Sequence, residues 1–238
     1  MIHLKQVGIH PDRFPVKDVY PFDLAVWQQA GTLDFKRTTT FFIGENGAGK
    51  STLLKAISQK CNIHIWQDDF NFRMMKNRYA EELYTALSVT WQNGPVKGSF
   101  FSSQIFSHFA QNLEEWAASD AGMLDYFGGR SLITQSHGQS LMAYFKSRYT
   151  IQGLYFLDEP ETALSPTSLI ELLKLLNRYN RTGEAQFIIA THSPILLACP
   201  GATIYSFGRD AITQVAYEET DYYKIYKSFM NAPDRFVD

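Results

Sequence analysis

Short apolar runs and segments of helical periodicity alternate along the second half of the chain. Residues 154–157 and 187–190 are continuous apolar runs of the length that a buried strand needs. Between them, Ser165 and Pro166 suit a helix start, with the serine as N-cap and the proline in the first turn. The apolar stripe that follows at helical spacing is Leu169, Leu172, Leu173 and Leu176. Strand, helix and strand in this order predict an α/β fold with a mainly parallel sheet.

The first and middle parts of the chain carry different patterns. Residues 1–43 read as short strands separated by Pro11, Pro15 and Pro21, and their last six residues form a β-branched and aromatic run that suits a buried strand. From about residue 70 the pattern becomes helical, and the predicted helices cover 79–90, 103–118 and 138–148. Near the end, residues 203–207 and 211–217 predict a hairpin that turns at 208–210.

A glycine-rich loop follows the predicted strand at 38–43 and leads into an apolar helical segment. Its residues are Gly44, Glu45, Asn46, Gly47, Ala48, Gly49, Lys50, Ser51 and Thr52, a complete G-x-x-x-x-G-K-S phosphate-binding pattern. Glycines allow backbone N–H groups to converge on phosphate oxygens at the positive end of a helix. We therefore expect a nucleoside triphosphate as ligand, with Lys50 on the β- and γ-phosphates and Ser51 on Mg²⁺.

Polar side chains end the two apolar strands of the second half. Asp158 and Glu159 follow the strand at 154–157, and His192 follows the strand at 187–190. Parallel strands present their carboxyl ends at one edge, where ligands of α/β folds bind. We expect Asp158 to hold the metal, Glu159 to polarise the attacking water and His192 to sense the γ-phosphate by a hydrogen bond.

These motifs in this order resemble the ATP-binding-cassette (ABC) class of P-loop ATPases. The resemblance implies a further signature at a helix start that reaches the ATP of a second subunit. Residues 135–140 occupy that position, where Ser136, Gly138 and Gln139 match the family pattern and His137 replaces its first glycine. The resemblance also implies a glutamine that contacts Mg²⁺ or the attacking water. Gln104 is our candidate for this role, with Gln92 and Gln111 as competing choices.

Two other elements of the class are less well matched. The loop at 161–165 corresponds to the family's D-loop, but Ser165 stands where an aspartate is usual. No residue is singled out as the adenine contact, although Phe14, Tyr20 and Phe22 are aromatic side chains that could stack on a base.

The resemblance implies one ATPase domain, an ABC-type head, over residues 1–238. We expect residues 1–69 and 150–238 to form the nucleotide-binding lobe, with antiparallel strands near the amino terminus, and 70–149 to form an inserted helical lobe. The 86 residues from Lys50 to Ser136 are far too few for the long coiled-coil arms of chromosome-maintenance relatives. The pattern looks most like small stand-alone bacterial ATPases related to the RecF/SMC/overcoming-lysogenization branch, which implies ATP hydrolysis and a nucleotide-dependent homodimer.

The composition of the chain excludes few kinds of binding partner. With 22 basic and 24 acidic residues the net charge is −2, which gives no global attraction to nucleic acid or to anionic membranes. No signal peptide or apolar run of about 20 residues is present, so we expect a cytoplasmic protein without membrane insertion of its own. Its expected role is an ATP-driven switch acting on a protein or nucleic-acid partner, in repair or anti-phage defence. The alternative is the nucleotide-binding subunit of a membrane transporter.

Overall fold

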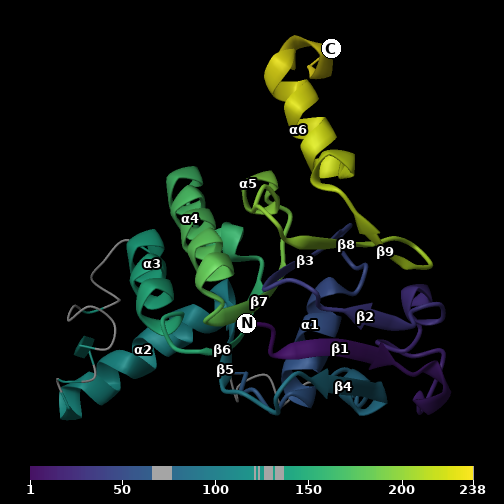
Figure 1. Ribbon diagram of the computed structural model, residues 1–238, viewed down its shortest axis with the longest axis horizontal. Coiled ribbons are helices and arrows are strands. Elements are labelled where there is room, and N and C mark those ends of the chain that lie inside the picture. Colours follow the sequence, from purple (N-terminus) through teal and green to yellow (C-terminus); the bar gives the residue numbers. More distant parts are fainter. Residues whose placement is uncertain (66–76, 121, 123, 126–130, 132–136, 238) are drawn as a thin grey trace.

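The computed structural model describes residues 1–65, 77–120, 122, 124, 125, 131 and 137–237. Its centre is a six-stranded sheet with the order β5-β6-β7-β3-β8-β9 (Figure 1). The strands are β3 (Thr39–Gly44), β5 (Gly98–Ser102), β6 (Gly153–Asp158), β7 (Ala185–Ala190), β8 (Thr203–Phe207) and β9 (Ile212–Val215). All neighbours are parallel except β8 and β9, which form the expected hairpin. The expected mainly parallel sheet is confirmed.

A smaller antiparallel sheet of order β2-β1-β4 lies near the amino terminus. It contains β1 (Leu4–Ile9), β2 (Thr32–Asp34) and β4 (Leu87–Trp91). The buried side chain of Gln186, on β7, ties this sheet to the central one. Its Oε1 accepts hydrogen bonds from the backbone N–H groups of His3 (2.7 Å) and Leu4 (2.8 Å), and its Nε2 donates to the Leu4 carbonyl (2.9 Å). A buried amide with this many bonds fixes the position of β1, since leaving any of these groups unpaired would be costly.

Helices cover both faces of the central sheet (Figure 1). They are α1 (Lys50–Lys60), α2 (Ser103–Ser119), α3 (His137–Arg148), α4 (Pro166–Thr182), α5 (Pro194–Leu197) and α6 (Asp221–Asn231). Short 3₁₀ turns lie at Pro11–Arg13, Ala25–Trp27, Leu83–Ala86, Pro160–Ala163, Tyr217–Glu219 and Pro233–Phe236. Helix α4 begins as expected, with the Ser165 hydroxyl accepting a hydrogen bond from the backbone N–H of Ser168 (3.2 Å).

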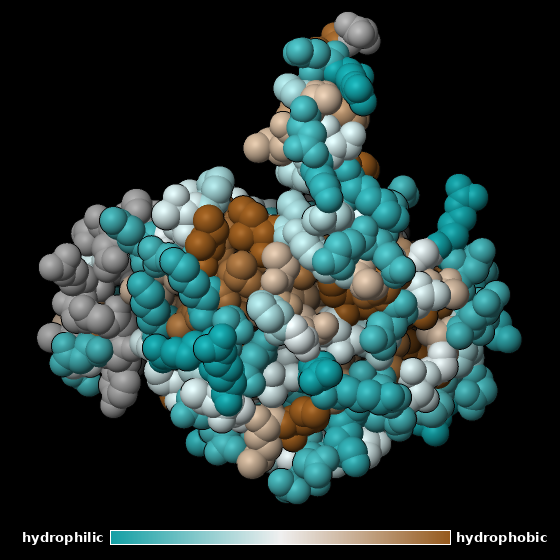
Figure 2. All heavy atoms as spheres, turned by 45° about the horizontal axis from the view of Figure 1, so that its top comes forward, coloured by the Kyte–Doolittle hydropathy of each residue, from teal (hydrophilic) through white to brown (hydrophobic). Residues whose placement is uncertain are grey.

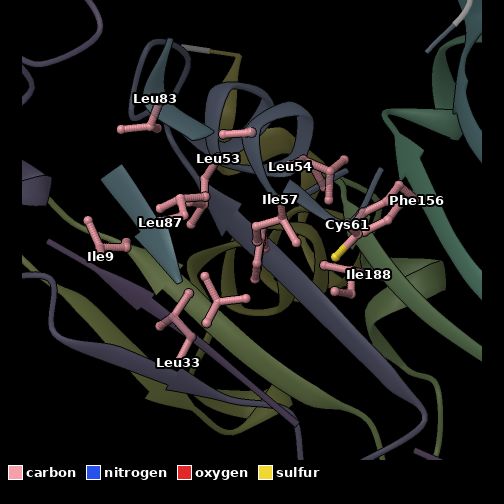
Figure 3. Close-up of a cluster of buried hydrophobic side chains, with 14 of the residues drawn as sticks. Ile9, Leu33, Leu53, Leu54, Ile57, Cys61, Leu83, Leu87, Phe156 and Ile188 are labelled. Atoms are coloured by element: carbon pink, nitrogen blue, oxygen red, sulfur yellow. The ribbon is translucent and has the colours of Figure 1, made fainter. Parts of the chain in front are cut away.

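The pleat of the central strands divides the core into two apolar layers. On one face, Phe156 and Ile188 pack against Leu54 and Ile57 of α1 and against the antiparallel sheet (Figure 3). On the other face, Phe187 and its neighbours pack against α3 and α4. Because α1 is enclosed between the two sheets, its first residue Lys50 is fixed at the edge of the central sheet.

The segment expected as helical from 70 to 149 contains two strands. The helix predicted over 79–90 is wrong: a 3₁₀ turn at Leu83–Ala86 passes directly into β4. Pairing of β4 with β1 decides the conformation there, since the β-branched and aromatic residues of Leu87–Trp91 suit a pleated surface. Strand β5 lies beside β6 in the central sheet, whereas α2 and α3 agree with the predicted helices.

Helix α6 stands clear of the body of the molecule (Figures 1 and 2). Its first turn is capped by Thr220, whose hydroxyl accepts a hydrogen bond from the backbone N–H of Tyr223 (3.2 Å). Further along, Ile225, Tyr226 and Met230 are exposed. None of the helices formed by the described residues combines the length and the hydropathy that a membrane span needs.

Both cysteine thiols are predicted to react slowly with thiol reagents in the folded protein. Burial raises the pKa of Cys61 to about 12 and that of Cys199 to about 11. Only the thiolate reacts, so at about pH 8 each thiol should react at least ~10²-fold more slowly in the native protein than in denaturant. Timed modification with a thiol reagent, read by mass spectrometry, measures this difference. Rapid labelling of either residue in the folded protein would contradict the burial described here.

Candidate nucleotide-binding and hydrolysis site

The carboxyl ends of β3, β6 and β7 bring the predicted site residues together. Asp158 at the end of β6 lies opposite Ala190 of β7, and Ala190 lies opposite Phe42 of β3. Backbone bonds continue this register beyond the strands: the Glu159 N–H donates to the Ala190 carbonyl (2.9 Å) and the Thr191 N–H to the Phe42 carbonyl (3.1 Å). Three chain segments that are distant in sequence therefore meet at one edge.

The glycines of the phosphate loop are required by both conformation and space. Gly44, Gly47 and Gly49 have φ angles of 141°, 81° and 94°, which favour glycine. A Cβ at Gly49 would lie 2.6 Å from the ring of Trp27. That ring is buried and fixed by its Nε1–H bond to the Pro21 carbonyl (2.8 Å). The loop residues Glu45, Asn46 and Gly47 are exposed, whereas Gly49 and Lys50 are buried.

Lys50 is buried in the position expected for a phosphate-binding ammonium. It donates to the carbonyls of Gly44 (2.8 Å) and Glu45 (2.9 Å), which hold it beneath the loop. Burial lowers the pKa of Lys50, and the negative charges of Glu159, Asp158 and Glu161 oppose that shift. A phosphate oxygen could replace the two carbonyls as a stronger, charged acceptor.

Ser51 and Asp158 form a pair that fits a magnesium ion. The Ser51 hydroxyl donates to Asp158 Oδ1 (2.7 Å), so two oxygen ligands already lie side by side. Burial raises the pKa of Asp158, and the bond from Ser51 opposes that shift. Among the described residues no group of three or more His, Cys, Asp or Glu side chains could hold a metal by itself. Mg²⁺ binds in many phosphate sites through one or two protein oxygens together with phosphates and water, and the Ser51 and Asp158 oxygens could supply them.

Gln104, the third expected metal contact, is placed by its backbone only. It is the second residue of α2, which begins directly after β5, and Ser102 at the end of β5 lies opposite Asp158. Its side chain lies outside the described part of the structure. Gln104 as a metal contact therefore stays a prediction.

Glu159 and His192 face each other at the same edge. The Glu159 Oε1 and His192 Nε2 atoms are 3.4 Å apart. Burial lowers the pKa of His192, the charge of Lys50 lowers it further, and Glu159 raises it. Glu159 adopts left-handed backbone angles, φ 46° and ψ 56°, a conformation that costs a non-glycine residue roughly 1–2 kcal/mol.

Two residues that we did not predict as site residues also contact His192. The Glu161 carboxylate accepts a hydrogen bond from the His192 backbone N–H, and burial raises its pKa. The Tyr222 hydroxyl lies 2.7 Å from His192 Nδ1. The sequence held a signal for Glu161, the third acid within four residues, whereas nothing local marks Tyr222, thirty residues downstream on α6.

The described signature residues start a helix on the opposite face of the central sheet from α1. Ser136 is outside the described residues; His137, Gly138 and Gln139 start α3, which packs beside α4. A Cβ at Gly138 would lie 3.5 Å from Ser168 Oγ, near the start of α4. Helix α3 packs on the opposite face of the sheet from α1 (Figure 1).

Two hollows flank the phosphate loop. One, of about 210 Å³, is lined by Tyr20, Ser51, Thr52 and Lys55 among others. The other, of about 780 Å³, lies between the loop, the β8–β9 hairpin and the start of α6. Of the three aromatic candidates for a base contact, Phe22 is fully buried and Phe14 packs on it (ring centroids 4.8 Å apart), whereas Tyr20 is exposed and hydrogen-bonded to Thr52 Oγ1 (2.8 Å).

Comparisons with known proteins show which families and folds this chain resembles. Residues 95–198 match the model of a family described as AAA domain, putative AbiEii toxin, Type IV TA system. The ferric enterobactin transport ATP-binding protein FepC of Escherichia coli K12 is 28% identical over 156 residues, 60% of this chain and 58% of that protein. The iron(3+)-hydroxamate import ATP-binding protein FhuC of Bacillus subtilis 168 is 25% identical over 173 residues, 66% of this chain and 64% of that protein.

A similarity in fold extends over nearly the whole chain. CbiO1 of Clostridium perfringens, part of the ABC transporter complex cbiONQ, aligns with a TM-score of 0.54 and 19% identity over 99% of this chain and 98% of that one. The fold is therefore that of an ABC-class P-loop ATPase, as the motifs predicted. The comparisons support this class without selecting a branch within it. The chain matches less than two thirds of the length of FepC and FhuC.

The strained backbone of Glu159 predicts that a glycine variant at this position is more stable than an alanine variant. Glycine adopts left-handed angles without the steric cost that alanine has, so Glu159→Gly should unfold with a free energy about 1 kcal/mol higher than Glu159→Ala. Glu171, on the exposed side of α4, is the matched control, because there glycine should be less stable than alanine by about 1 kcal/mol. Urea denaturation of the four variants measures both differences. The same order at both positions would contradict the left-handed conformation of Glu159.

Proposed function

We propose that this chain binds ATP with Mg²⁺ and hydrolyses it. The observation that carries this proposal is the meeting of Lys50, the Ser51–Asp158 pair and the Glu159–His192 pair at one sheet edge. Lys50 and the loop N–H groups would bind the β- and γ-phosphates. Ser51 and Asp158 would hold Mg²⁺, which supplies positive charge that neutralises the phosphate oxygens during transfer.

Glu159 is the residue proposed to activate water. The Glu159 side chain is 38% exposed, so a water molecule can reach it. Its negative charge also interacts with the ammonium of Lys50. The water oxygen forms a bond to the γ-phosphorus as the bond to the ADP oxygen breaks, and Glu159 accepts a proton from the water. His192, just beyond the end of β7, lies beside this carboxylate, with its Nε2 atom 3.4 Å from Glu159 Oε1.

Tyr20 is the proposed contact for the base. Thr52 follows the lysine and serine that would bind the terminal phosphates, so a side chain bonded to Thr52 lies beside the inner part of a bound nucleotide. The exposed ring of Tyr20 meets that condition, whereas Phe22 belongs to the core. A flat aromatic face at this position would stack on adenine.

The signature residues are proposed to act on the ATP of a second copy. Gly138 and Gln139 start α3, on the face of the sheet opposite α1, so they are poorly placed to reach Lys50 of the same chain. A two-fold dimer with two ATP molecules between the copies would bring the start of α3, with Ser136, to the opposite phosphate loop. The positive end of α3 would then face the γ-phosphate.

We propose that this ATP-dependent dimer is a switch that acts on a protein or nucleic-acid partner. The changes at His137 and Ser165 from the transporter-type pattern support this choice, as does the family model matched over 95–198. The second candidate function is that of a transporter's nucleotide-binding subunit, which the names of FepC and FhuC favour. Purification without detergent, followed by identification of what accompanies the chain, distinguishes the two.

The first functional prediction separates binding from chemistry. Glu159→Gln should leave ATP affinity nearly unchanged and lower kcat by about 10²- to 10⁴-fold, because the water loses its proton acceptor. Lys50→Ala should instead weaken ATP binding, since a direct phosphate contact disappears. Calorimetry and phosphate release measure the two effects. Wild-type turnover in folded Glu159→Gln protein would rule out the role assigned to this carboxylate.

A second functional prediction concerns association. With ATP and Mg²⁺, Glu159→Gln should elute as a dimer in light-scattering chromatography, because the sandwiched nucleotide is retained. Adding Ser136→Arg should return the protein to the oligomeric state that it has without nucleotide, since a bulky side chain would enter the interface. Ser119→Arg, at the exposed end of α2, is the control and should leave the dimer intact. A Ser136→Arg double variant that still dimerises with ATP would show that residues 135–140 are not the intersubunit element.

A further inference from the structure

Tyr222 links three parts of the chain at the candidate site. It lies in the first turn of α6 and is half-buried. Its hydroxyl is 2.8 Å from the carbonyl oxygen of Gly44, the first residue of the phosphate loop, and 2.7 Å from His192 Nδ1. The phenol therefore bridges the phosphate loop and the histidine at the end of β7.

The direction of these two hydrogen bonds follows from the chemistry of the groups. A carbonyl oxygen can only accept, so the single hydroxyl hydrogen of Tyr222 is donated to Gly44. The phenolic oxygen must then accept from His192, which requires the proton on Nδ1. Burial raises the pKa of Tyr222, so the phenol keeps its hydrogen at neutral pH.

We propose that Tyr222 is a positioning residue that fixes His192 in the Nδ1–H tautomer and holds its ring against the phosphate loop. This inference rests on the proposed ATP hydrolysis. In that tautomer the lone pair of Nε2 points toward the reacting edge, where Glu159 Oε1 lies 3.4 Å away. With its lone pair free, Nε2 can accept a hydrogen bond from the attacking water, and this acceptor role replaces the donor role toward the γ-phosphate that the sequence led us to expect.

The Glu161 carboxylate holds the same histidine from its backbone. Because Glu161 accepts from the His192 N–H, the residue is anchored at both the main chain and the ring. The ring of Tyr222 also packs edge-on against the imidazole, with centroids 5.5 Å apart. Tyr222→Phe keeps this ring packing and removes only the hydroxyl, so it isolates the hydrogen-bond bridge from simple packing.

The first test reads the tautomer directly. In nucleotide-free protein labelled with ¹⁵N-histidine, the ring nitrogen shifts of His192, assigned with His192→Gln, should show a protonated Nδ1 and an unprotonated Nε2. In Tyr222→Phe the shifts should move toward the Nε2–H form. Tyr226→Phe, on the exposed part of the same helix, is the control and should leave the spectrum unchanged. Identical His192 shifts in wild type and Tyr222→Phe would overturn the proposal.

The second test measures the kinetic consequence. Tyr222→Phe should lower kcat about tenfold and change ATP affinity less than about twofold, because one hydrogen bond that orients the histidine is lost while the phosphate contacts remain. In the His192→Gln background the same change should have no further effect. A full additional loss in that background would show that Tyr222 acts independently of His192 and would overturn the proposal. Absence of ATPase activity in the wild type would instead contradict the proposed function, and the tautomer measurement would still decide the role of Tyr222.

Discussion

The crowding of charge at one edge of the parallel sheet is the constraint on which the site depends. One buried ammonium, Lys50, lies among three carboxylates, Asp158, Glu159 and Glu161, and burial disfavours the charged forms of Lys50, Asp158 and Glu161. Lys50 is satisfied by loop carbonyls and Asp158 by a serine hydroxyl. Negative charge is in excess among these four groups, which opposes the binding of a phosphate ligand without a cation. A nucleotide that arrives with a divalent cation supplies the missing positive charge, which is why the two are expected together.

Much of this edge is predictable from sequence because parallel strands impose it. The phosphate loop begins at the end of β3, and Asp158, Glu159 and His192 lie at or just beyond the ends of β6 and β7. Strands in parallel register must end together. The helix at α4 and the hairpin of β8 and β9 are predictable for a similar reason, since their caps, turn residues and periodicity are all local. These elements need no knowledge of what packs against them.

The residues that escaped prediction depend on contacts between distant segments. Tyr222 reaches Gly44 and His192 across 178 and 30 residues, and no local pattern encodes such a bridge. The segment around 79–90 carries apolar residues that suit either a helix or a strand, and pairing with β1 decides between them. In the sequence, Gln186 is an ordinary polar residue directly before the apolar run at 187–190. Only the structure shows the three hydrogen bonds by which its side chain anchors β1.

The departures from the transporter pattern separate two kinds of residue. Every expected residue whose side chain the structure places at the central edge, Lys50, Ser51, Asp158, Glu159 and His192, keeps the type that phosphate chemistry requires. The changed residues, His137 and Ser165, lie at the starts of α3 and α4, on the opposite face of the sheet from α1. If a second copy meets this chain there, the differences from the transporter pattern concern how two subunits communicate rather than how phosphate is transferred. Selection for a different partner would act on such contacts first, because a shared fold fixes the chemistry of the edge and leaves the outer helices free to change.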